Sequence, residues 1–280
     1  MNNMLTGRWL RYGFQFAVSA AVLWLLAGLT GCAAGGGPLP GSNDSSAEIM
    51  TASDEPDLRR RARLRLELAV GYFEQGQTTV ALDELKQVLS LDPTFGDAYN
   101  LRGLIYMRLN DPKSSEESFR RAIALNARDA DALHNYGWFL CQRGRYSEAQ
   151  QAFSGALTNP LYRDRAKTFL AQGLCEARAG QRDQAERSLG RAYELDAANP
   201  VTGYNLALLL YMRGDFTRAQ FYIRRLNNSE QANAESFWLG VRVERRMNNS
   251  AAMLQLADQL KRRFPQSREA AAYERGVFDE

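Results

Sequence analysis

The chain has 280 residues, of which 45% are hydrophobic and 24% are charged. This composition is ordinary for a globular protein, and it excludes a collagen-like or wholly disordered chain. The 35 Lys and Arg residues against 32 Asp and Glu residues leave a net charge of +3. That balance provides no electrostatic case for nucleic acid, so we expect no nucleic-acid partner.

The first 31 residues have the organisation of an export signal. Arg8 and Arg11 supply positive charge, and an apolar segment of 14 residues, Phe16 to Leu29, follows them. Such a segment is shorter than the ~20 residues of a membrane-spanning helix, but it fits the core of a signal peptide. We therefore predict a signal peptide at residues 1–31.

The segment Leu29 to Cys32 reads Leu-Thr-Gly-Cys and resembles the lipobox of bacterial lipoproteins. The resemblance makes Cys32 the lipidated first residue of the mature chain; the alternative is a buried or disulfide-bonded cysteine. Acyl chains anchor a protein without a spanning helix, because each buried methylene contributes about 0.8 kcal/mol. Ala33 stands where lipoproteins of the inner membrane carry Asp, so the resemblance implies the outer membrane, facing the periplasm.

Residues 32–57 are small, polar and interrupted by proline, which is typical of a flexible tether. We expect the folded domain to occupy residues 58–280. At its start, the arginines between Arg59 and Arg65 could contact lipid head groups or an acidic partner. The alternative is a solvated first turn and outer helix face.

From residue 62 onward the chain repeats itself in steps of 34, 34, 36, 34 and 33 residues. Position 8 of each repeat is Gly or Ala, as at Gly137, and position 24 is large and apolar, as at Phe153. This pattern predicts an all-α tetratricopeptide-repeat superhelix, with two antiparallel helices per repeat and the first helices lining a concave groove. The predicted repeats are 62–95, 96–129, 130–165, 166–199, 200–232 and 233–266, followed by a capping helix in 267–280.

The sequence lacks the parts of an active site. His134 is the only histidine, so a two-histidine zinc helix is excluded. Cys141 lies seven residues further along the same predicted helix, a rise of ~10 Å, which is too far for a Cys–His nucleophile pair. His134, Cys141 and Cys175 could supply three metal ligands, but no fourth is visible. We expect no enzyme, no metal and no cofactor beyond the covalent lipid.

Cys141 and Cys175 are 34 residues apart, at positions 12 and 10 of neighbouring first helices. These helices should pack side by side, and the predicted periplasm is oxidising. The spacing and the compartment together favour a disulfide over two buried thiols.

Several segments resemble the PilF/PilW family of type IV pilus biogenesis lipoproteins: LHNYGWFL (133–140), NPLY (159–162), FWLGVRVERRMNN (237–249) and LKRRFPQS (260–267). The resemblance covers nearly the whole mature chain. Gln172 and Glu176 of repeat four depart from the repeat pattern, because an apolar residue is usual at the position of Glu176.

The family resemblance implies a pilotin, a lipoprotein that promotes outer-membrane localisation and oligomerisation of the pilus secretin. The implied partners are the secretin and, through the lipid, the membrane, and we expect a monomer. Two alternatives share the anchor and the repeats. One is an adaptor for another envelope assembly, such as proteases or barrel insertion, and the other is an organiser of peptidoglycan-linked complexes.

Positions 2, 5, 9, 12 and 13 of each first helix should face the groove. Aromatic residues and Met are typical anchors of interfaces, and Trp138 at position 9 is the foremost of these. The alternative for each residue is that it seals neighbouring helices. The predicted groove residues are Asn100, Leu104, Met107, His134, Trp138, Leu170, Leu174, Tyr204, Leu208 and Tyr211.

Overall fold

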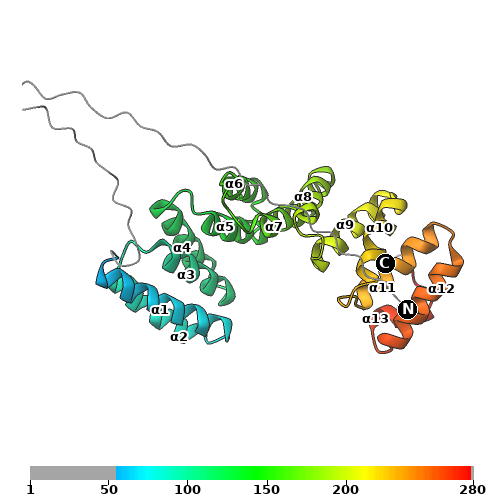
Figure 1. Ribbon diagram of the computed structural model, residues 1–280, viewed down its shortest axis with the longest axis horizontal. Coiled ribbons are helices and arrows are strands. Elements are labelled where there is room, and N and C mark those ends of the chain that lie inside the picture. The colour runs from blue at the N-terminus through cyan, green and yellow to red at the C-terminus, as the bar shows by residue number, and fades with distance from the viewer. Residues whose placement is uncertain (1–54, 279–280) are drawn as a thin grey trace, which may run out of the picture. The chain divides into compact units, whose positions relative to one another are not determined.

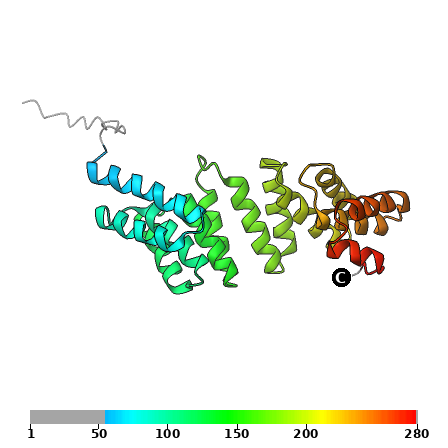
Figure 2. The ribbon, with the colours of Figure 1, turned by 90° about the horizontal axis from the view of Figure 1, so that it is seen from below.

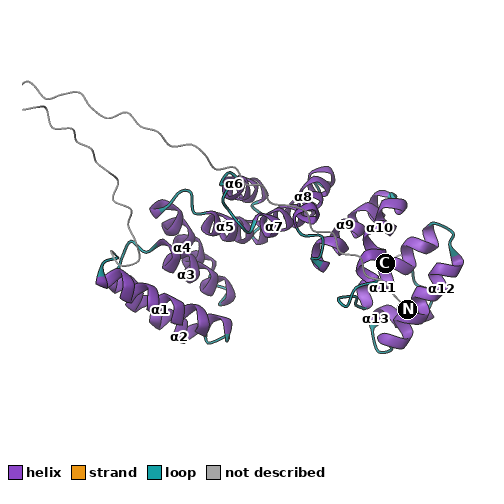
Figure 3. Ribbon diagram, in the orientation of Figure 1, coloured by secondary structure: helices purple, strands orange, loops and turns teal. Residues whose placement is uncertain are grey.

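The computed structural model describes residues 55–278, and within this range the chain forms thirteen helices and no strand. The all-α prediction is thereby confirmed (Figure 3). The predicted signal peptide, Cys32 and most of the tether lie outside the described residues. The helices are α1 Asp57–Glu74, α2 Thr78–Leu91, α3 Gly96–Arg108, α4 Pro112–Leu125, α5 Ala130–Gln142, α6 Tyr146–Leu157, α7 Arg165–Arg178, α8 Arg182–Leu195, α9 Pro200–Arg213, α10 Phe216–Asn227, α11 Ala234–Arg246, α12 Ser250–Arg263 and α13 Arg268–Glu274.

The helices are arranged as six pairs that follow one another in chain order (Figures 1 and 2). Each odd-numbered helix from α1 to α11 packs on the helix after it, and from α3 onward it also packs on both helices of the preceding pair. The short helix α13 packs on α11 and α12. This is the stacking of tetratricopeptide repeats, in which each pair buries its apolar surface against its neighbours.

In the second, third and fourth pairs, the two helices cross where a glycine on the first meets a large side chain on the second. A Cβ added to Gly103 would lie 2.6 Å from the ring of Phe119, and one added to Gly137 would lie 2.8 Å from the ring of Phe153. Both rings are fully buried. The small residues at position 8 and the large residues at position 24 are therefore the two sides of one contact.

The first helices end at residues in the left-handed conformation. Asn110 and Asn248 have φ of 55° and 57°, and glycine takes the same position in the other repeats, as at Gly144 with φ of 75°. Gly and Asn adopt this conformation at low cost, so the chain turns sharply into the second helix.

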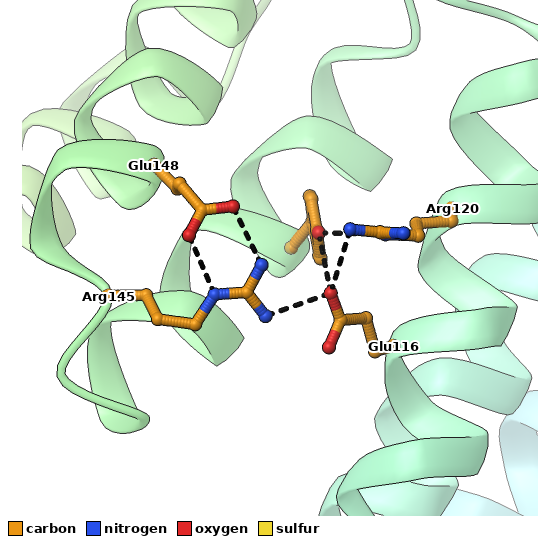
Figure 4. A network of polar contacts seen from close by, with 5 residues as sticks. Glu116, Arg120, Arg145 and Glu148 are labelled. Carbon is orange, nitrogen blue, oxygen red and sulfur yellow. Dashed lines mark hydrogen bonds and ion pairs between the residues drawn. The ribbon is translucent and has the colours of Figure 1, made fainter.

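A network of charged side chains joins the second and third pairs (Figure 4). Arg145 binds Glu148 at 2.6 Å and Glu116 at 2.8 Å, and Glu116 also contacts Arg120 and accepts a hydrogen bond from Tyr136. Burial alone would raise the pKa of Glu116, but the hydrogen bonds from Arg145 and Tyr136 outweigh it, and the pKa is lowered. The carboxylate therefore stays ionised and holds α4, α5 and α6 together.

A second network lies near the carboxyl end of the stack, and its central carboxylate, unlike that of Glu116, is fully buried. Glu244 in α11 is 1% exposed and lies 2.7 Å from the guanidinium of Arg224 in α10. Gln220 and Asn249 each donate to the same carboxylate at 2.9 Å. Because the charge is paired and its oxygens are hydrogen-bonded, it can lie in the interior and fix α10, α11 and the start of α12 relative to one another.

The helix crossing predicts that Gly103→Ala destabilises the protein. The new methyl group must displace the buried ring of Phe119, and overpacking of this kind costs about 1–3 kcal/mol. A Cβ on Gly71, in the interior of α1, meets nothing within 4 Å. Gly71→Ala should therefore stabilise by about 0.5–1 kcal/mol. Urea unfolding midpoints measure both, and equal midpoints for the two variants would contradict this account of the crossing.

Candidate protein-interaction site

Nine of the ten predicted groove residues are partly exposed, and one, His134, is buried. The nine lie on four successive first helices. We call this set the first-helix face. It consists of Asn100, Leu104 and Met107 on α3, Trp138 on α5, Leu170 and Leu174 on α7, and Tyr204, Leu208 and Tyr211 on α9.

Apart from Leu174, the apolar residues of the first-helix face pack in two groups against the core. Leu104, Met107 and Trp138 pack on the cluster that contains Phe119 and Phe139. Leu170, Tyr204, Leu208 and Tyr211 pack on the cluster around Leu206. Each of these side chains therefore seals neighbouring helices with one part of its surface and presents another part to solvent.

Arginines from the first helix of the next repeat lie over two aromatic rings of the face. The guanidinium of Arg178 in α7 is 5.1 Å from the ring centre of Trp138 in α5, and that of Arg242 in α11 is 5.2 Å from the ring centre of Tyr211 in α9. Such cation–π contacts stabilise by about 0.5–1 kcal/mol at exposed sites. Neither arginine is among the groove residues predicted from the sequence. Arg178 could have been found, because it occupies position 13, which the repeat pattern places on the groove.

Two polar residues of the face also have defined roles. Asn135 in α5 donates to the side-chain oxygen of Asn100 in α3 at 3.0 Å, so the two first helices are joined across their surface. Burial raises the pKa of Tyr204, which keeps its hydroxyl protonated and able to donate a hydrogen bond.

The prediction that His134 faces the groove is wrong. Its side chain is 5% exposed, and its ring lies 6.0 Å from the ring of Phe153. The Nδ1 atom is 2.8 Å from the hydroxyl of Thr168 on α7. Burial, together with the nearby Lys167, lowers the pKa of His134 to about 4, so the ring is neutral at physiological pH. The residue is an internal contact between α5 and α7.

The contact continues into the junction between α6 and α7. Thr168 donates to the hydroxyl of Tyr162 at 3.3 Å, and Tyr162 donates to the carboxylate of Asp131 at 3.3 Å. Because Thr168 donates its proton to Tyr162, its oxygen accepts from Nδ1–H of His134. Burial raises the pKa of Tyr162 to about 12. The longer third junction, with its Asn-Pro-Leu-Tyr segment, is thus fastened by hydrogen bonds to both neighbouring first helices.

A disulfide joins Cys141 in α5 to Cys175 in α7, and the Cα atoms are 5.7 Å apart. Both sulfurs are therefore unavailable as thiolate ligands for a metal together with His134. Within residues 55–278, no group of three or more His, Cys, Asp and Glu side chains is arranged to hold a metal ion. The bond crosses directly under the first-helix face, since both cysteines belong to the cluster on which Trp138 packs.

The unusual pair in repeat four lies on the inner side of α7. Glu176 is 4% exposed and accepts a hydrogen bond from Gln172 at 2.9 Å. The two side chains line a small space between α6 and α7 together with Tyr146 and Phe153. The polar residues thus replace hydrophobic packing at this interface by a hydrogen bond within α7, which remains a regular helix.

Four of the five arginines between Arg59 and Arg65 form ion pairs within the chain. Arg59 pairs with Asp92 and stacks over the ring of Phe95, and Arg65 pairs with Glu84 at 2.8 Å. Arg60 and Arg63 pair with neighbouring acids of the same segment, whereas Arg61 forms no ion pair with any described residue.

Across residues 55–278, no helix is long and apolar enough to cross a membrane.

Comparison with protein families agrees with the repeat architecture. The family model described as TPR repeat matches residues 71–110, and the one described as Tetratricopeptide repeat matches residues 101–166. The chain is 31% identical over 254 residues to the type IV pilus assembly protein PilF of Pseudomonas aeruginosa, covering 90% of this chain and 96% of that protein.

Solved structures show the same relationship. The structure of Pseudomonas aeruginosa PilF matches with a TM-score of 0.70 at 29% identity and covers 78% of this chain and 99% of its own. PilW, described as a widely conserved type IV pilus biogenesis factor, matches with a TM-score of 0.69 at 28% identity, covering 77% and 99%. YrrB, a TPR protein with a peptide-binding site, matches at 17% identity with a TM-score of 0.57, which shows a shared fold alone.

The buried histidine predicts that stability falls between pH 7 and pH 5. In the unfolded chain His134 binds a proton near pH 6.5, whereas the folded protein resists protonation down to about pH 4. The free energy of unfolding should therefore decrease as the pH falls through this window, by about 2 kcal/mol at pH 5. Urea unfolding at both pH values measures the change. In His134→Gln, the free energy of unfolding should decrease less between pH 7 and pH 5. If it decreases as much as in the wild type, the pH dependence comes from other titratable groups.

The disulfide predicts a loss of stability on reduction. It closes a loop with a sequence separation of 34 residues, and the chain-entropy estimate for such a loop is about 3–4 kcal/mol. Thermal unfolding with and without reductant measures this loss. A variant with Cys141→Ala and Cys175→Ala should be as unstable as the reduced protein and insensitive to reductant; full stability of that variant would contradict the prediction.

Proposed function

Because this chain belongs to the PilF family of type IV pilus assembly proteins, we propose that it is an outer-membrane lipoprotein that acts as a pilotin. In this role it promotes the localisation and oligomerisation of the pilus secretin. Membership of the family supports a role for this tetratricopeptide-repeat protein in type IV pilus biogenesis. We infer that its partner is the secretin.

The observation that carries the proposal is the first-helix face. Its aromatic and aliphatic side chains are held in place by core packing, as Trp138 is, yet keep part of their surface exposed. Preorganised side chains of this kind bind a partner at a low cost in conformational entropy. Arg178 beside Trp138 adds donors for the carbonyl or carboxylate groups of a bound segment. We infer that the bound element is an extended segment of the secretin with apolar side chains. We also infer that this protein is a protein-interaction scaffold without catalytic or cofactor chemistry.

The proposed anchor lies outside the described residues. We propose that residues 1–31 are a signal peptide, that Cys32 carries the lipid, and that residues 32–57 tether the repeat domain of residues 58–280 to the outer membrane. The Leu-Thr-Gly-Cys segment supports the proposal that Cys32 is lipidated, and the small, polar composition of residues 32–57 supports the proposal of a flexible tether. A lipid-anchored monomer could then carry a bound secretin subunit along the membrane surface.

Secretin multimers in cells that produce variants of this protein test the proposal. Trp138→Ala should lower the multimer level about tenfold or more, because buried aromatic anchors at interfaces commonly contribute about 2 kcal/mol or more. Phe221 on the second helix α10 is 60% exposed, so Phe221→Ala removes an aromatic ring away from the face and should leave the multimers unchanged.

Deletion of the whole protein should abolish the multimers and twitching motility. Both variants should still fold and unfold cooperatively, although loss of the packing of Trp138 on its cluster should lower the unfolding midpoint of Trp138→Ala. Intact secretin rings in the deletion strain would overturn the pilotin role. Normal multimers with a well-folded Trp138→Ala protein would instead reject the first-helix face as the binding site.

A further inference from the structure

The side of α1 that points away from the rest of the stack carries an apolar stripe. Leu64 and Leu68 are 52% and 54% exposed, and Arg61 lies three residues before Leu64 on the same side of the helix. Among the described residues, α1 packs only on α2 and α3. We call Arg61, Leu64 and Leu68 the α1 outer face.

The same repeat positions are covered in repeats two to five, whereas Glu235 at position 3 of repeat six is exposed. Leu64 is at position 3, and its counterparts in repeats two to five are at most 1% exposed: Ala98, Ala132, Thr168 and Thr202. The bond of Thr168 to His134 shows that position 3 contacts the first helix of the preceding repeat. Leu68 is at position 7, where Tyr136 in repeat three bonds to Glu116 on the second helix of the preceding repeat. Leu64 and Leu68 thus occupy positions that a preceding helical pair covers elsewhere.

The two ends of the stack differ in this respect. At the carboxyl end α13 packs on α11 and α12, and Ala270 of α13 is buried with Phe237 and Leu260 in one apolar cluster. Terminal repeats of a solenoid need either such a cap or a polar outer surface. The α1 outer face has neither within the described residues, and exposed apolar side chains at such a position indicate an interaction site.

The charges beside the leucines indicate what kind of partner fits. Arg61 has no ion pair within residues 55–278, and the pair of Arg60 with Asp57, at 3.3 Å, is exposed and contributes little. The α1 outer face itself contains no acidic side chain, so a second copy docked through the same face would leave Arg61 unpaired. An acidic side chain opposite Arg61 would be attracted instead.

We propose that the α1 outer face binds an amphipathic helix of another polypeptide, in the place that a preceding repeat would occupy. The apolar stripe of that helix packs on Leu64 and Leu68, and an acidic residue at its edge pairs with Arg61. This site is separate from the first-helix face, so the protein has two surfaces through which it can join different components of one assembly.

Photo-crosslinking of the full-length protein in cells tests this inference. The variant Leu68→p-benzoylphenylalanine should form a covalent adduct with a different protein, and the crosslinked peptide, mapped by mass spectrometry, should carry apolar residues at helical spacing and acidic residues beside them. Arg61→Glu in the same background should lower the adduct at least fivefold. Arg262→Glu, at the exposed end of α12, changes the net charge equally and should leave the adduct unchanged.

Several outcomes would overturn the inference. The adduct could form only with lipid, with residues 33–54 of the same chain or with a second copy of the protein. The adduct could also persist undiminished in Arg61→Glu. Finally, a protein whose unfolding midpoint is that of the wild type could form no adduct. The first-helix face is tested separately, because Trp138→Ala should remove secretin multimers without changing the adduct at position 68.

Discussion

The structure depends on one close contact, repeated along the chain, between the two helices of each pair. Where Gly103, Gly137 and Gly173 face their second helices, a Cβ would come within 2.6 to 2.8 Å of the opposing side chain. The crossing can therefore form only with a small residue on one helix and a large one on the other. Because this contact fixes how each first helix is rotated, it also decides which of its side chains are buried and which remain at the surface.

Polar contacts then join one pair to the next, and they differ from junction to junction. The carboxylate of Glu116 binds Arg145 between the second and third pairs, and Glu244 is fully buried between the fifth and sixth. At the third junction the contacts are a disulfide and the hydrogen bonds that run from His134 to Asp131. These individual contacts, added to a uniform repeat, fix successive helical pairs relative to one another.

The repeat period and the small and large residues at fixed positions were sufficient to predict the fold, because they record the helix crossing directly. The partial exposure of Trp138 and Tyr211 also follows from their positions. His134 could not be placed in the same way. Its burial depends on the hydroxyl of Thr168, 34 residues later in the next repeat, and nothing within its own repeat indicates that partner. The cation–π contact of Arg178 likewise joins two repeats. Position within one repeat predicts the contacts inside that repeat well; between repeats it located the Cys141–Cys175 disulfide but not the partner of His134.

The central claim is that the first helices, and not the second, bind the secretin. Amide hydrogen exchange of the full-length protein, with and without the purified secretin, tests this most directly. Binding should slow exchange in α5, α7 and α9 and leave α6, α8 and α10 unchanged. Protection confined to the second helices, or unchanged exchange throughout at saturating secretin, would contradict it.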